Sequence, residues 1–571
     1  MSCSHPDKNQ TQDSQVNQRL DQSALGYDPT LTSSEAASLP HEILTPENSA
    51  ALAQNIQVQN VSRDSRKIVT FGSTDPSNPY NWSTGKKSYI TFAGIVMVIN
   101  STLESSLPSG AIQAITEYFN VTSQIQFPLP ISCFIAGYTI GPTLAAPLSE
   151  YHGRKYVMLG FFLLATISTL ACAVAPNWPA LLIFRFLSGL GASGPIGTVG
   201  GLYADIYSDP QTRGSAMTWF MIATTGGPVI APPISGFIAA KSWRWVFGFG
   251  TLLATASIPL ILVMPETYGP VLLRRKAQKL REETGDREIF SKSELEQRSL
   301  HHILTVVMTR PWRMLFQEVI VMCVSAYCAL AYGIFYLYFQ AYPKIFQGPD
   351  SVYKWSPGVA GLAFLPIGLG AICAAPVYIW WNSVLRRARK QNSPWTKQEE
   401  YNRLPLACIG GPMFVISLFW IGWSAKQNVH WLAPVSSGVL WGLGFLLIFL
   451  ALLNYLTDAY ETFAASAQSI ASTCRSVFGV VLPLASSRMF ETLGIAWACS
   501  LLAFLSLSMV AIPFAFIRFG NTIRANSKFC QQLKDLKVKE AAEQEERERN
   551  ELQLNTDGNS ANGEKVPDGL V

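Results

Sequence analysis

Charged side chains are scarce in this chain of 571 residues, because Asp, Glu, Lys and Arg together make up only 14% of it. An average soluble domain carries about a quarter, so the composition argues against one. Residues 1–85 lack an apolar core that could act as a signal peptide. The ten cysteines lack the spacing of a metal or redox site, and no catalytic constellation stands out. We therefore expect neither an enzyme nor a protein with a metal or an organic cofactor.

Long apolar runs fill the middle of the chain. A run of about 20 apolar residues can cross the hydrocarbon core of a bilayer as a helix. We count twelve runs, six on each side of a hydrophilic loop, at roughly 88–107, 124–146, 155–175, 178–204, 214–240, 245–264, 316–342, 357–381, 404–424, 431–456, 463–487 and 495–517. The sequence therefore predicts an all-α polytopic membrane protein with two six-helix halves.

The basic residues between these runs indicate how the chain is oriented. Arg154 and Lys155 follow the second run, and further Lys and Arg cluster in the central loop and after the eighth run, whereas the loops after the first and third runs have none. Loops rich in Lys and Arg remain in the cytoplasm. We therefore expect five segments: a disordered cytoplasmic tail (1–85), the first half (86–264), a cytoplasmic central loop (265–315), the second half (316–519) and a cytoplasmic tail (520–571).

The same topology bears on the expected partners, the membrane and a modification site. The formal net charge of +5 does not indicate a nucleic-acid partner, because the basic residues of the membrane region gather in a few loops. We expect a monomer in the plasma membrane, with the vacuolar membrane as the alternative. Asn120 begins an Asn-Val-Thr sequence in an outer loop, so it is a predicted glycosylation site.

The short loop between the second and third runs combines a glycine with fixed charges. Glu150 precedes Gly153 by three residues, and Arg154 and Lys155 follow it directly. A tight turn flanked by charges between two spans is typical of a hinge. We expect Glu150, Gly153, Arg154 and Lys155 to form a cytoplasmic gate.

Three polar residues within the spans are candidates for chemistry, because charges are costly inside a membrane. Glu104 lies near the outer end of the first span, and Asn100 lies one helical turn below it. Arg185 lies at a similar depth in the fourth span, so we expect it to approach Glu104 and Asn100. A carboxylate beside an arginine can release a proton and take it up again when its surroundings change. The alternative for Glu104 and Arg185 is a static buried ion pair.

The fifth span carries a dense cluster of Gly and Pro that includes Gly227, Pro228, Pro232 and Gly236. Proline removes a helical hydrogen bond and bends the helix, and neighbouring helices can satisfy the freed carbonyl groups. We expect this bend to shape or seal a pathway.

The seventh span is aromatic. Tyr332, Phe335, Tyr336 and Phe339 lie close together on it, and an aromatic cavity suits flat, apolar or cationic ligands. We place these four residues, Asn100, Gln468 and Arg475 in a substrate cavity. Lipid-facing aromatics remain an alternative, as does a structural hydrogen bond for Arg475 and Gln468.

Four motifs resemble those of the fungal major facilitator transporters in the twelve-span drug:H+ antiporter family, which includes multidrug, polyamine and toxin exporters. They are PYNWS at 79–83, PLSEYHGRK at 147–155, RFLSGLG at 185–191 and GPVIAP at 227–232. The resemblance covers about residues 75–520. It departs at Ala146, where the superfamily has Gly, at Glu150 and Tyr151, where it has Asp and Arg, and at Ala231, a place often held by Gly.

The resemblance implies a proton-coupled exporter whose two halves rock about a central site. It implies proton coupling at Arg185, a gate at residues 150–155 and an antiporter motif in the fifth span. We expect efflux of small amphiphilic or cationic molecules, such as drugs, fungicides or toxins, with protons as the driving ion. The alternatives are a polyamine or metabolite exporter of narrow range and a transporter-like sensor.

Overall fold

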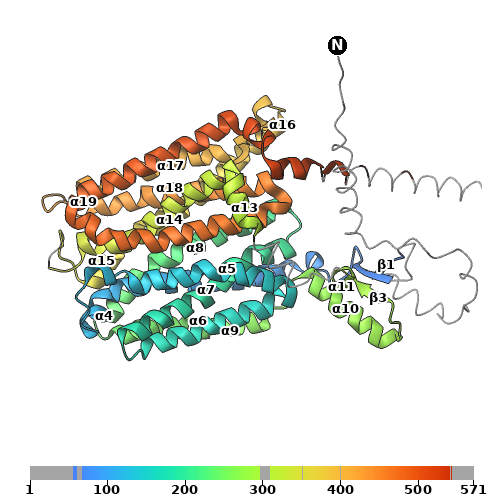
Figure 1. Ribbon diagram of the computed structural model, residues 1–571, viewed down its shortest axis with the longest axis horizontal. Coiled ribbons are helices and arrows are strands. Elements are labelled where there is room, and N and C mark those ends of the chain that lie inside the picture. Colours follow the sequence, from blue (N-terminus) through green and yellow to red (C-terminus); the bar gives the residue numbers. More distant parts are fainter. Residues whose placement is uncertain are drawn as a thin grey trace, which may run out of the picture. The chain divides into compact units, whose positions relative to one another are not determined.

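The computed structural model describes residues 56–60, 67–295, 309–349, 351–398 and 400–535, together with 537–539, 542 and 549. Within these ranges, eleven helices are long and apolar enough to cross a membrane. They form two bundles that lie side by side, one from each half of the chain (Figure 1).

The first bundle contains six long helices, with short helical turns at their ends. The long ones are α3 (Thr84–Ser106), α5 (Leu129–His152), α6 (Arg154–Ala173), α7 (Trp178–Ile206), α8 (Pro210–Ala239) and α9 (Trp243–Val263). The short ones are η1 (Pro79–Asn81), η2 (Ser109–Ala111), α4 (Ile112–Tyr118) and η3 (Gln124–Gln126).

The second bundle has five long helices. They are α14 (Val319–Phe346), α16 (Leu365–Lys390), α17 (Glu400–Ser424), α18 (Leu432–Tyr460) and α19 (Ala464–Ala525). The shorter elements are α13 (Arg310–Gln317), α15 (Pro357–Leu362), η5 (Pro394–Lys397) and η6 (Glu461–Phe463).

Helix α19 accounts for the twelfth span. It has 62 residues and is broken at Gly494, whose φ of 71° is not helical. An unbroken helix of that length would measure about 90 Å, three times the thickness of the hydrocarbon core. The break therefore divides α19 into two spans near the expected boundary, and the predicted all-α polytopic fold with two six-helix halves is confirmed.

Glycines allow the helices within each bundle to touch backbone to backbone. A Cβ atom on Gly189 of α7 would overlap the carbonyl oxygen of Phe134 in α5. In the second bundle, a Cβ atom on Gly442 of α18 would overlap the carbonyl oxygen of Ile367 in α16. Such contacts supply packing where lipid provides no hydrophobic driving force between helices.

A small sheet joins the region before the first span to the region after the sixth. Strand β1 (Ile56–Asn60) pairs antiparallel with β2 (Lys67–Phe71), and β2 pairs in parallel with β3 (Ile289–Ser291). Helix α10 (Gly269–Thr284) covers the sheet, and α11 (Lys292–Leu295) follows β3. Figure 1 shows β1 and β3 beside α10.

The sheet lies within segments that we expected to be a tail and a loop. Residues 67–71 belong to the tail predicted over 1–85, but Val69 is fully buried against Ala277 and Leu280 of α10. Buried Asp75 forms an ion pair with Lys276. Burial would raise the pKa of the Asp75 carboxyl, but the hydrogen bonds from Lys276 and Ser77 outweigh it and hold the pKa below its usual value. The described part of the tail is therefore attached to α10.

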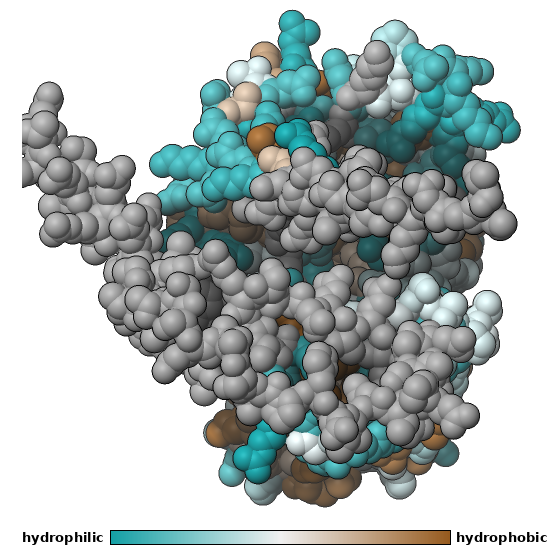
Figure 2. Space-filling model, turned by 90° about the vertical axis from the view of Figure 1, so that its right-hand side faces the viewer, coloured by the Kyte–Doolittle hydropathy of each residue, from teal (hydrophilic) through white to brown (hydrophobic). Residues whose placement is uncertain are grey.

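The two ends of the bundles differ, and we call them the α10 end and the α4 end after the elements that they carry (Figure 1). Figure 2 looks at the α10 end, where hydrophilic residues gather over the upper part of the described surface. The first 55 residues lie outside the described ranges, as do most residues after 539, so those parts of the two predicted tails have no structural account here.

Candidate functional site

The turn between α5 and α6 is built around Gly153. This residue has a φ of 101°, a conformation that favours glycine. Directly after it, the backbone N–H groups of Arg154 and Lys155 donate to the Glu266 carboxylate, at 2.8 and 3.2 Å. The N–H groups of Thr267 and Tyr268 donate to the same carboxylate, both at 3.0 Å. Glu266 thus ties the beginning of α6 to the segment after α9.

The Arg154 side chain is buried in the same place. Its Nε donates to Asp205 Oδ2 at 3.1 Å and its Nη1 to Ser149 Oγ at 2.6 Å. The guanidinium also lies 4.8 Å from the centre of the Tyr268 ring. The arginine therefore links the ends of three helices, α5, α6 and α7, within the first half.

Glu150 takes no part in this network. Its side chain is exposed, and it has no hydrogen bond or ion pair to any described residue. Arg154 instead uses Asp205 and Glu266, two acids that we did not assign to the gate. Both stand where a span ends, which is a signal in the sequence that would have identified them. Lys155 Nζ donates to the carbonyl of Leu262 at 2.7 Å.

Glu104 and Arg185 come together, but not as an ion pair. Arg185 is fully buried, and its Nη2 donates to the backbone carbonyls of Glu104 and Ser105 at 3.0 and 3.2 Å. Its Nε donates to the carbonyl of Pro130 at 2.9 Å, and the guanidinium lies 4.5 Å from the ring centre of Phe134. Backbone carbonyls thus supply the acceptors that we expected from a carboxylate.

The Glu104 carboxylate is directed at neutral donors. Its Oε2 accepts from the hydroxyls of Thr169 at 3.1 Å and Ser188 at 3.2 Å. The side chain is 3% exposed. Because hydroxyls can donate to a carboxylate and accept from a carboxylic acid, this pocket can accommodate either protonation state of Glu104.

Two residues assigned to the substrate cavity lie elsewhere. Asn100 Nδ2 donates to Ser257 Oγ at 3.0 Å and to the carbonyl of Val96, so it faces α9. Gln468 Nε2 donates to Thr457 Oγ1 and to the carbonyl of Leu453, which joins α19 to α18. Both contacts are between helices, which was the alternative for Gln468.

The aromatic residues of α14 lie in the interior. Tyr332, Phe335, Tyr336 and Phe339 are all at most 6% exposed, which excludes the lipid-facing alternative. The Tyr332 ring centre is 6.3 Å from that of Phe449 in α18, and the Phe335 ring centre is 5.4 Å from those of Trp441 and Phe445.

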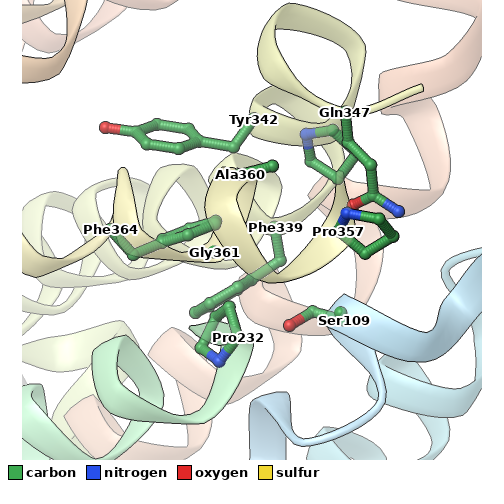
Figure 3. Close-up of a pocket in the computed structure, with 11 residues that line it drawn as sticks. Ser109, Pro232, Phe339, Tyr342, Gln347, Pro357, Ala360, Gly361 and Phe364 are labelled. Carbon is green, nitrogen blue, oxygen red and sulfur yellow. The ribbon is translucent and has the colours of Figure 1, made fainter. Parts of the chain in front are cut away.

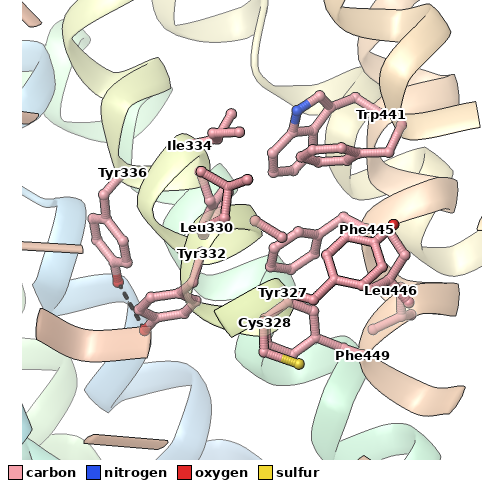
Figure 4. Close-up of a cluster of buried hydrophobic side chains, with 14 of the residues drawn as sticks. Tyr327, Cys328, Leu330, Tyr332, Ile334, Tyr336, Trp441, Phe445, Leu446 and Phe449 are labelled. Atoms are coloured by element: carbon pink, nitrogen blue, oxygen red, sulfur yellow. Dashed lines mark hydrogen bonds between the residues drawn. The ribbon is translucent and has the colours of Figure 1, made fainter. Parts of the chain in front are cut away.

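One of these aromatics also connects the two halves. The Tyr336 hydroxyl donates to Ser105 Oγ of α3 at 2.9 Å, and the Tyr332 and Tyr336 hydroxyls are 3.5 Å apart (Figure 4). Ser105 is also the residue whose carbonyl accepts from Arg185. A chain of polar contacts therefore runs from the Glu104–Arg185 region into the second half.

A narrow pocket lies at the end of this series of polar contacts. Its lining comes from α8 of the first half and α14, α18 and α19 of the second: Met221, Thr224, Thr225, Tyr332, Phe335, Phe445, Leu446, Phe449 and Arg475. We call it the central pocket. The sequence had indicated Tyr332, Phe335 and Arg475, whereas the other six are uncharged residues with no local signal of function.

Helix α8 contacts both halves through its Gly and Pro residues. Pro232 has no N–H and leaves the carbonyl of Pro228 free, and the Ser106 hydroxyl donates to that carbonyl at 2.8 Å. Gly227 lies against Thr102 of α3, and Gly236 lies against the backbone of Pro357 in the second half. The glycines of α8 therefore allow close contact between the halves near the α4 end.

A second narrow pocket lies beside this contact. Figure 3 shows Pro232 and Ser109 on one side of it and Phe339, Pro357 and Gly361 on the other. Asn120 lies at the same end, exposed and with a φ of 53°, and its glycosylation stays a prediction.

A sequence model of the Major Facilitator Superfamily matches residues 92–483. The chain belongs to the major facilitator superfamily. This match confirms our prediction of the family. Proteins of this superfamily are multi-pass membrane transporters of small molecules. As a member, this transporter combines the two-bundle fold with a pocket between the bundles.

Two similar curated proteins come from fungi. It is 36% identical to the "MFS-type efflux pump MFS2" of Trichophyton rubrum over 467 residues, 81% of this chain and 77% of that protein. It is 37% identical to the "Major facilitator superfamily multidrug transporter mdrA" of Aspergillus fumigatus over 480 residues, 83% of this chain and 78% of that protein.

A solved structure supports the fold. The partially occluded, inward-open conformation of the xylose transporter XylE from E. coli aligns with a TM-score of 0.55 at 15% sequence identity. The alignment covers 76% of this chain and 98% of XylE. This likeness concerns the fold alone.

Proposed function

We propose that this transporter exports small amphiphilic molecules, such as drugs, fungicides or toxins, in exchange for protons. The central pocket is the observation that carries this proposal. It lies between the halves, is lined mainly by aromatic and aliphatic side chains, and includes one arginine. Small-molecule sites are typically apolar with a few polar groups, and transporters of this kind place them where the halves meet.

The direction of transport is supported by the relatives. Two fungal proteins more than 35% identical to this chain are named as an efflux pump and a multidrug transporter. The segment of α8 that resembles an antiporter motif is followed by Gly236, which contributes a contact between the halves.

Proton coupling is assigned to Glu104 with Arg185. The carboxylate is buried and held by two hydroxyls rather than by an ion pair, so protonation can occur without breaking an ion pair. Its helix α3 is linked to the second half through Ser105 and Tyr336. Protonation at Glu104 can therefore influence whether the two halves stay in contact.

Alternating access follows from where the halves touch. Ser132 Oγ donates to the Val480 carbonyl at 3.3 Å and Ser487 Oγ to the Gln124 carbonyl at 3.2 Å, both towards the α4 end. At the α10 end, the network of Arg154 stays within the first half, and the Arg403–Asp458 pair at 2.9 Å stays within the second. We infer that this conformation is closed at the α4 end, and we assign the α10 end to the cytoplasm and the protein to the plasma membrane.

The test is an efflux assay in a yeast strain from which drug transporters have been deleted. Cells that express this chain should retain less of a fluorescent amphiphilic dye than cells with an empty vector. A protonophore should abolish the difference. Equal retention across a panel of neutral, acidic and basic compounds would contradict the proposal.

A further inference from the structure

Arg475 has no polar partner among the described residues of the central pocket. It lies in the first span of α19, and its guanidinium is 5.4 Å from the ring centre of Tyr332. No hydrogen bond or ion pair joins it to any residue that the structure describes, and its buried Nε has no acceptor. Arg185, the other deeply placed arginine, has three carbonyl acceptors.

The charge of Arg475 is not balanced by an acid in the same pocket. The described lining contains no Asp or Glu. The acid described nearby in α3, Glu104, accepts its hydrogen bonds from Thr169 and Ser188 in the first half. A ring face offsets part of the charge of a cation, but an arginine inside a membrane normally pairs with an acid or with carbonyls. The positive charge of Arg475 therefore has no counter-charge in the described lining of the pocket.

We propose that the central pocket binds small organic anions, namely molecules with a flat apolar body and one carboxylate that pairs with Arg475. This inference rests on the proposed export function and narrows its substrates. It differs from the cations that the aromatic residues alone suggested, because an unpaired arginine repels a cation.

The rest of the lining fits the apolar body of such a molecule. Tyr332 and Phe335 of α14 and Phe445 and Phe449 of α18 contribute four aromatic rings. Thr224 and Thr225 lie across from them on α8. A ligand that pairs with Arg475 would touch both halves, so its charge would be neutralised at the interface that must open and close.

Geometry also explains why a carboxylate is the favoured anion. The planar guanidinium presents a fork of N–H donors that matches the two oxygens of a carboxylate. Carboxylic acids have a pKa near 4, so a substrate of this class is ionised at neutral pH.

The proposal is tested with three probes that share one ring system: 2-naphthoate, 2-naphthamide and 2-naphthylmethylammonium. Their affinities for the purified full-length protein are measured by calorimetry at pH 7.5. We expect 2-naphthoate to bind about 10- to 100-fold more tightly than the amide, as a charge-assisted pair implies, and the ammonium probe to bind most weakly.

Variants test whether the preference for 2-naphthoate depends on the Arg475 side chain. Arg475→Gln should weaken 2-naphthoate binding by about 10- to 100-fold and change amide binding by less than about twofold. Arg475→Lys should recover part of the affinity, since it keeps the charge but loses the fork. Arg488→Gln is the matched control, because Arg488 is exposed on the same helix and lines neither described pocket.

The order of the three probe affinities on the wild-type protein tests the proposal even if Arg475→Gln does not fold. Tighter binding of the ammonium probe, equal binding of acid and amide, or no binding of 2-naphthoate would overturn the proposal. Dye efflux that needs the proton gradient, without 2-naphthoate binding, would leave the export function standing and remove this inference. Arg475-dependent binding of 2-naphthoate without any efflux would contradict the export function and leave the binding site standing.

Discussion

At the residue scale, the two intramembrane arginines of this transporter have opposite surroundings. Arg185 is fully buried and donates to three backbone carbonyls, whereas Arg475 has no described acceptor. Although Arg185 Nη1 has no described acceptor, the other donors of this arginine connect the helices that supply the three carbonyls. We propose that Arg475, which has no described acceptor at all, attracts a ligand of opposite charge. On these proposals, the same residue type serves coupling in one half and binding in the other.

Arg185→Ala should lower efflux at least tenfold, because it removes the donors to the Glu104, Ser105 and Pro130 carbonyls beside the proton site. Dye accumulation in yeast measures efflux, and surface labelling measures the amount of protein. The matched control is Arg213→Ala, an exposed residue near the beginning of α8. Wild-type efflux by Arg185→Ala at normal surface abundance would contradict the role given to this arginine.

Glu266→Gln should destabilise the transporter by about 2 kcal/mol, because charge-assisted hydrogen bonds from four backbone N–H groups are weakened. Glu150→Gln should change the stability by less than about 0.5 kcal/mol, since Glu150 is exposed and has no described partner. Thermal unfolding in detergent compares the two variants. A larger loss from Glu150→Gln would show that Glu150 is the acid that stabilises this turn.

At the element scale, the sequence predicts those features that depend on hydropathy and on short motifs. The spans and the turn at Gly153 were predictable, because each depends on neighbouring residues. The meeting of Glu104 and Arg185 at one level of the bundle was also predictable from the helical rise. The rotation of a helix about its axis was not, and it decides that Asn100 faces Ser257 of α9 rather than the central pocket.

Long-range pairing was likewise beyond the sequence. Strand β2 pairs with β3 across more than 200 residues, and nothing local to Val69 indicates that α10 will cover it. Thr224 and Thr225 became part of the central pocket only through the packing of α8 between the halves.

The contact between Ser106 and the Pro228 carbonyl of α8 can be tested by a double-mutant cycle. Ser106→Ala leaves the Pro228 carbonyl without a donor, so it should cost about 1–2 kcal/mol in the wild-type background. In a Pro232→Ala background, residue 232 regains an N–H that can bond that carbonyl, so Ser106→Ala should cost less. Thermal unfolding of the four proteins gives the coupling energy. Equal costs in both backgrounds would show that Ser106 does not compensate for Pro232.

At the scale of the whole molecule, alternating access requires that the contacts between the two halves break at one end and form at the other. In this conformation, hydrogen bonds such as that of Ser132 to Val480 join the halves towards the α4 end. The Arg154 and Arg403 networks each remain within one half at the α10 end. Rocking of the halves would have to break the first set.

A reversible cross-link tests this rocking. Ser132→Cys with Val480→Cys, in a background without native cysteines, introduces one thiol on each side of the contact between the Ser132 hydroxyl and the Val480 backbone carbonyl. Oxidation should reduce efflux by about tenfold or more, and reduction should restore it. The single variant Ser132→Cys should be insensitive to oxidation. Full efflux by the cross-linked double variant would mean that the halves do not separate here.

The central claim is that a proton taken up at Glu104 drives export through the pocket between the halves. The most direct measurement is substrate transport into vesicles that contain the purified transporter, with an imposed pH gradient. We expect an acidic interior to raise the accumulation of substrate several-fold in the wild type. Glu104→Gln should bind substrate normally but lose this dependence on the gradient. Wild-type accumulation that ignores the gradient, or a Glu104→Gln variant that still follows it, would contradict the account.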